Sequence, residues 1–140
     1  MDKRTLPNDI LLGEVTAALR EGRDAIITPT GNSMRPFIRG GVDRVVLSKR
    51  ETLAVGDIAL ACLDGRYILH RIVALDGDAV TLMGDGNLRG TERGHASDIV
   101  GTVTAIIRPD GHRRAPGKGR LWRALLPVRR YLLAIYKRLI

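Results

Sequence analysis

The sequence predicts a mainly β domain that begins with one helix and ends with a basic amphipathic helix. Short runs rich in Val, Ile and Leu follow one another between Gly/Asp turns, whereas helical spacing of apolar residues occurs near the two ends. Successive strands without intervening helices favour an antiparallel architecture over an alternating α/β fold. The length of 140 residues fits a single domain.

The predicted N-terminal helix belongs to residues 1–23. Asn8 or Asp9 can cap its start, and Gly22 can end it. Apolar residues at helical spacing give it one face to bury, and these are Ile10, Leu11, Val15, Ala18 and Leu19.

The predicted β domain spans residues 24–108. Its apolar runs predict six strands, over residues 24–28, 44–47, 57–63, 66–75, 79–83 and 99–107. The dipeptides Asp64-Gly65 and Asp76-Gly77 predict hairpin turns between neighbouring strands. Residues 84–98 are rich in Gly and Arg and are predicted to form a long loop, which in a small domain often carries function.

Positive charge is concentrated near the C-terminal end. Residues 1–110 contain 14 Lys/Arg and 15 Asp/Glu, whereas residues 111–140 contain nine Lys/Arg and no acid. After a predicted linker at 109–119, residues 120–140 show the pattern of a basic amphipathic helix with a kink near Pro127. Such a helix is typical of segments that lie on an anionic membrane surface. The expected membrane contacts are Trp122, Arg123, Arg130 and Lys137.

Other functions of this helix stay open or rank lower. It can instead pack on the β domain or pair with a second copy. Nucleic-acid binding is not expected, because aromatic residues make up 4% of the chain and no recognition motif is present. No run is apolar enough to span a bilayer, and Met1–Pro7 lacks the apolar stretch of a signal peptide. We therefore expect a cytoplasmic protein, peripheral at the inner membrane face if the helix binds lipid.

The lone Cys62 and the lack of paired histidines predict no metal site, and no cofactor is expected.

The segment that points to chemistry is Gly31-Asn32-Ser33-Met34-Arg35-Pro36, of the form G-x-S-M-x-P. A serine in a glycine-initiated turn projects its hydroxyl from a rigid backbone, and successive turn amides can point at an oxyanion. Ser33 is thus a candidate nucleophile, with an ordinary turn serine as the alternative. We expect Met34 and Pro36 to contact the substrate.

Further blocks make the sequence resemble the signal peptidase I family, within the wider group of serine peptidases that includes the LexA-type self-cleaving repressors. The blocks match in order over about residues 24–107, at 31–36, 42–46, 55–58, 69–73 and 84–87. The resemblance implies a fold of coiled β-sheets and a serine nucleophile at Ser33.

The general base implied by the resemblance is His70. Bacterial signal peptidases have a lysine at this position, so His70 is closer to the Ser-His arrangement of the endoplasmic-reticulum and archaeal enzymes. A lysine base must be desolvated until its pKa falls by several units, whereas a histidine needs little tuning near neutral pH. A histidine base usually requires an acid that orients it. The family places acids in the loop that begins with the fifth block, which makes Asp85 the first candidate and Glu92 the second.

The oxyanion site departs from the bacterial pattern. Those enzymes have a serine donor two residues before the nucleophile, where this sequence has Gly31. The remaining donors are the Ser33 amide with Thr30 or Asn32. The resemblance implies an endopeptidase that cleaves a precursor or leader peptide after small residues. Because Gly31 supplies no serine donor, an alternative stays open, in which the protein is a catalytically weak or inactive module that binds peptides at a membrane surface. A self-cleaving regulator is disfavoured, because no lysine matches the base position.

Overall fold

The computed structural model describes residues 8–139, and the side chains of residues 12–139. Outside this part lie residues 1–7, Ile140 and the side chains of residues 8–11, among them Ile10 and Leu11 of the predicted helix face. The chain order of the elements is α1 (Asn8–Arg20), β1 (Ala25–Ile27), β2 (Arg44–Ser48), β3 (Ile58–Leu63), β4 (Arg66–Asp76), β5 (Ala79–Met83), β6 (Glu92–His95), β7 (Ile99–Ile107), β8 (Arg113–Arg114), α2 (Arg120–Ala124) and α3 (Arg129–Leu139). The prediction of a mainly β protein with an N-terminal and a C-terminal helix is confirmed.

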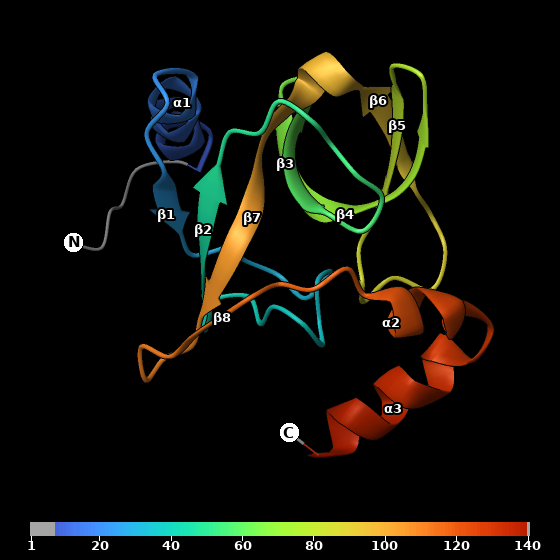
Figure 1. Ribbon diagram of the computed structural model, residues 1–140. Helices are drawn as coiled ribbons and strands as arrows, with labels where there is room; N and C mark the ends of the chain where they lie inside the picture. Colours follow the sequence, from blue (N-terminus) through green and yellow to red (C-terminus); the bar gives the residue numbers. More distant parts are fainter. Residues whose placement is uncertain (1–7, 140) are drawn as a thin grey trace.

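The strands form one antiparallel sheet that curls into a half-barrel (Figure 1). Their order is β1-β2-β7-β3-β4-β5-β6, and β8 pairs with β7. Register shifts at Val46/Leu47, Leu60/Ala61 and Ile72/Ala74 interrupt the ladders of three strand pairs. Such bulges bend strands and increase their twist, which favours the curled shape.

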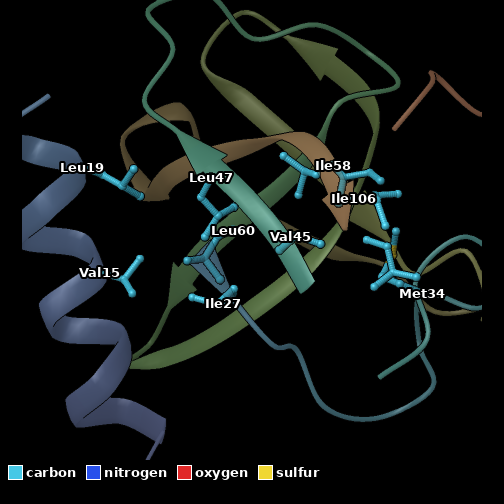
Figure 2. Packing of buried hydrophobic residues seen from close by; sticks show 11 residues of the cluster. Val15, Leu19, Ile27, Met34, Val45, Leu47, Ile58, Leu60 and Ile106 are labelled. Atoms are coloured by element: carbon cyan, nitrogen blue, oxygen red, sulfur yellow. The ribbon is translucent and has the colours of Figure 1, made fainter. Parts of the chain in front are cut away.

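The main core extends from α1 along the sheet to Met34, on the side away from the helix (Figure 2). Val15 and Leu19 on the helix lie in the same buried cluster as Leu47 on β2 and Leu60 on β3. Met34, which follows Ser33 in the chain, belongs to this cluster and is 5% exposed. Burial of one such side chain stabilises the fold by about 1.5–3 kcal/mol. The core therefore holds the backbone of the turn that carries Ser33.

The six predicted strands all occur, with ends within about two residues of those expected. The predicted 84–98 loop is wrong in its second half, because Glu92–His95 form β6 on β5 and Ala96–Asp98 form a 3-10 turn. The predicted linker likewise contains the short strand β8. Both missed strands are short and polar, so pairing with a neighbouring strand defines them rather than an apolar pattern.

The C-terminal segment is broken at the expected place. Helix α2 ends at Ala124, a 3-10 turn covers Leu126–Val128 with Pro127 inside it, and α3 follows. Proline lacks an amide hydrogen and cannot continue a regular helix. None of the helices within residues 8–139 combines the length and the apolar character needed to cross a membrane.

Candidate active site

Ser33 lies in a tightly hydrogen-bonded turn between β1 and β2. The amides of Phe37 and Ile38 donate to the Met34 carbonyl oxygen, both at 3.0 Å. The Gly86 amide, from the loop after β5, donates to the Ser33 carbonyl oxygen at 2.8 Å. The backbone from Ser33 onward is thus held by hydrogen bonds, as a nucleophile requires.

His70 on β4 is held by a carboxylate. Its Nδ1 lies 2.6 Å from Oε1 of Glu92, and the imidazole is largely buried. Glu92 reaches this position because β6 pairs with β5 in a register that places it opposite Leu82. When the Nδ1–H donates a hydrogen bond to the carboxylate, Nε2 is the nitrogen left to accept a proton.

Ser33, His70 and Glu92 line one cleft of about 290 Å³. The Ser33 turn and the imidazole both approach Gly84 closely. A Cβ atom at Gly84 would lie 2.4 Å from the Ser33 carbonyl oxygen and 3.0 Å from Nε2 of His70. A glycine is therefore needed at this position, and the Nε2 edge of His70 lies beside the Ser33 turn.

Asp85, the first-ranked acid, has a different partner, so that ranking is corrected. Its buried carboxylate accepts two hydrogen bonds from Arg71, from Nε and from NH2, both at 2.8 Å. Arg71 also donates to the carbonyl oxygens of Gly56 and Gly117. This ion pair joins β4 to the loop after β5 and to the segment before α2. Both oxygens of the Asp85 carboxylate are thus engaged by Arg71, whereas the carboxylate in contact with His70 is that of Glu92.

The predicted oxyanion donors separate in space. Thr30 lines the cleft with Ser33, whereas Asn32 lines a different groove beside α3. Gly31 has a φ of +82°, a conformation that serine adopts only with strain. The backbone conformation therefore favours the glycine that stands at this position. The Ser33 amide and the Thr30 hydroxyl remain candidate donors, since both residues line the cleft.

The expected substrate contacts also divide. Met34 lines the cleft, although most of its side chain is in the core. Its Sδ accepts a hydrogen bond from the Asp85 amide at 3.5 Å. Pro36 is half-buried and is not among the residues that line the cleft.

The cleft continues toward α1 as a second hollow of about 440 Å³. The two spaces share Pro29, Thr30 and Tyr67, and the second adds the apolar side chains of Ile27 and Leu60. Residues 66–70 of β4 pair with β3 on one edge, while pairing with β5 starts at Arg71. Within the described chain, the other edge of residues 66–70 has no strand partner and borders the cleft. An extended peptide can add there as a strand.

The four residues expected at a membrane surface do not share one environment. Trp122 is half-buried against the body, where its indole N–H donates a hydrogen bond to the Asp85 carbonyl oxygen at 2.7 Å. Arg123 is half-buried and donates to the Lys118 carbonyl oxygen. Arg130 and Lys137 are exposed.

A buried residue next to Trp122 escaped the sequence analysis. Arg129 is 3% exposed, donates to the carbonyl oxygens of Asn87 and Trp122, and stacks on the Trp122 ring at 5.1 Å. Burial lowers the pKa of Arg129, and Asp85 partly opposes this effect. The arginine fixes α3 to the loop that also supports the Ser33 turn.

A second buried network lies at the end of that turn. Asp43 is fully buried and accepts hydrogen bonds from the Arg39 amide at 2.8 Å, the Arg39 guanidinium, and NH1 of Arg108 at 2.6 Å. Burial alone would raise the pKa of Asp43, but the hydrogen bonds from Arg39 and the charges of Arg108 and Arg39 outweigh it and lower the pKa.

Among residues 8–139, no three His, Cys, Asp or Glu side chains lie close enough together to hold a metal ion.

No protein-family model matches the sequence, and no curated protein is significantly similar to it.

Proposed function

We propose that the protein is a signal-peptidase-like serine endopeptidase that cleaves a precursor or leader peptide. The observation that carries this proposal is the 2.6 Å contact between His70 and Glu92 in a cleft that Ser33 also lines. The ordered sequence blocks support it, and the curled antiparallel sheet is compatible with the coiled β-sheets of that family.

In the proposed mechanism, Oγ of Ser33 attacks the scissile carbonyl while Nε2 of His70 takes its proton. Glu92 stabilises the resulting imidazolium and keeps its orientation. His70 then gives the proton to the leaving amine. A water molecule that His70 deprotonates hydrolyses the acyl-enzyme, and His70 returns the proton to Oγ of Ser33 as the new carboxyl product leaves. The Ser33 amide and the Thr30 hydroxyl are the proposed oxyanion donors, with Asn32 as the alternative.

The substrate is proposed to bind as an extended strand along residues 66–70. Its side chains on one side of the scissile bond would enter the hollow lined by Tyr67 and Ile27. By analogy with the family, small residues precede the cut, as in an Ala-x-Ala sequence.

The decisive experiment is cleavage of a precursor-peptide library, with products identified by mass spectrometry. Wild type is expected to cut after small residues, and the Ser33→Ala and His70→Ala variants are expected to lose cutting. Ser97→Ala and His95→Ala are matched controls, because both side chains are exposed and neither lines the cleft. Cutting that survives Ser33→Ala would overturn the proposal.

A second candidate is a peptide-binding module at a membrane surface. It is favoured by the apolar stripe on α3, where Tyr131, Ile135 and Leu139 are 57%, 56% and 80% exposed on a basic helix. This function predicts equal peptide affinity for wild type and Ser33→Ala, no cleavage by either, and co-sedimentation with anionic vesicles. Loss of that co-sedimentation in Ile135→Ser would connect membrane binding to the stripe.

A further inference from the structure

A groove of about 420 Å³ separates α3 from the Ser33 turn. Asn32 and Arg35 line it from the turn, and Arg130, Leu133 and Lys137 line it from the helix. Its size lies in the range of about 300–1,000 Å³ that is usual for ligand sites.

The charge of this groove has one sign. Arg35, Arg130 and Lys137 border it, and no carboxylate is among its lining residues. Nε of Arg35 is buried and has no hydrogen-bond partner among the residues that the structure describes. A buried donor without an acceptor is unfavourable, and the positive charge of Arg35 stands at the wall of the groove. Arg130 keeps donors free beside its contact with the Tyr131 hydroxyl, because a guanidinium carries five N–H groups.

The groove and the cleft meet the Ser33 turn at neighbouring residues. Thr30 and Tyr67 line the cleft with Ser33, while the adjacent Asn32 lines the groove. A peptide that extends from the cleft past Asn32 would reach Arg35 and α3.

We propose that this groove is a subsite for acidic side chains of the substrate, on the side of the scissile bond away from the Tyr67 hollow. This inference rests on the proposed peptidase function. A peptide is favoured over lipid because the cations line a concave space, with Arg35 half-buried in it. The apolar stripe that suits a membrane is made of other residues, Tyr131, Ile135 and Leu139.

The kinetic test compares peptides that carry an Ala-x-Ala sequence next to a run of Glu or, in a matched peptide, Gln. Both orders are used, with the run before or after Ala-x-Ala. In one order, kcat/KM is expected to be about three- to tenfold higher for the Glu peptide, and the difference should shrink in high salt. Lys137→Glu should abolish this preference, so that the Glu and Gln peptides have equal kcat/KM. Arg138→Glu is the matched control, since it makes the same charge change at an exposed residue that does not line the groove.

Binding to the Ser33→Ala variant separates the groove from the chemistry. Fluorescence anisotropy with labelled Glu and Gln peptides should show the same preference and the same loss in Lys137→Glu. If wild type cleaves no peptide while this binding preference persists, the proposed peptidase function is wrong and the proposal of a groove for acidic side chains is supported. Equal binding of the Glu and Gln peptides, or equal effects of Lys137→Glu and Arg138→Glu, would overturn the groove. Lys137-dependent binding to anionic vesicles without a peptide preference would assign the cations to lipid instead.

Discussion

Glu92 is the residue whose substitution separates the proposed chemistry from stability most cleanly. Glu92→Gln keeps the size of the side chain but removes the charge that stabilises a protonated His70. We expect kcat/KM to fall by about two to four orders of magnitude. Thermal unfolding should change little, because the carboxylate is partly exposed. Steady-state kinetics measures kcat/KM, and calorimetry measures thermal unfolding. A Glu92→Gln variant with wild-type activity would show that Glu92 has no role in the mechanism.

Asp85 should respond in the opposite way. Asp85→Asn leaves the Arg71 guanidinium, which is fully buried, without a countercharge. Breaking one side of a buried ion pair typically costs about 3–5 kcal/mol, so the free energy of unfolding should fall by that amount. Urea denaturation measures it, with Asp24→Asn as a control at an exposed carboxylate. A variant as stable as wild type would show that the pair does not stabilise the fold.

The contrast between these two acids shows what the sequence alone could decide. Blocks whose residues stand in order along the chain predict Ser33 and His70 as candidate catalytic residues. The choice of acid depended on the pairing of β6 with β5, which brings Glu92 to His70. Nothing in the local pattern of a short, polar, glycine-containing strand reveals that pairing, so the sequence ranked Asp85 first.

At the scale of elements, the apolar strands were predictable because alternation and Gly/Asp turns are local signals. The position of the C-terminal helices was not, because it depends on single contacts to distant residues. Trp122 and Arg129 contact Asp85 and Asn87, which lie far away in the chain. These contacts bring α3 next to the Ser33 turn and create the groove.

Docking of this C-terminal segment can be followed through Trp122, the one tryptophan of the chain. Arg129→Ala removes the stacking on the indole and the hydrogen bonds to Asn87 and Trp122. We expect the emission of Trp122 to shift to longer wavelength and acrylamide quenching to increase, because the indole gains contact with water. Arg138→Ala, at an exposed position of α3, should change neither. Identical spectra for Arg129→Ala and wild type would mean that Arg129 does not hold the segment.

At the scale of the whole molecule, buried ion pairs join segments that are distant in sequence. Asp43 connects the end of the Ser33 turn, through Arg39, to Arg108 at the end of β7. Arg71 connects β4 to Asp85 and to the chain before α2. The curled sheet supplies the elements, and these pairs fix the loops that carry the candidate site. Global stability and the geometry of the site should therefore be coupled.

Asp43 makes that coupling depend on pH. Its pKa is lowered in the folded protein from the usual 3.8, so its contribution to stability is present above about pH 3.8 and is lost as pH falls through the lower folded value. Asp43→Asn should reduce the free energy of unfolding by about 2–4 kcal/mol near neutral pH, because the buried charge-assisted hydrogen bonds from Arg39 and Arg108 are lost. As pH falls from 3.8 toward the lower folded pKa, Asp43 becomes protonated in the unfolded chain first, so the gap between the two proteins should narrow. Thermal unfolding measured from about pH 7 to pH 2.5 gives this gap directly, with Asp24→Asn as the exposed control. A gap that stays constant over this range would show that folding does not lower the pKa of Asp43.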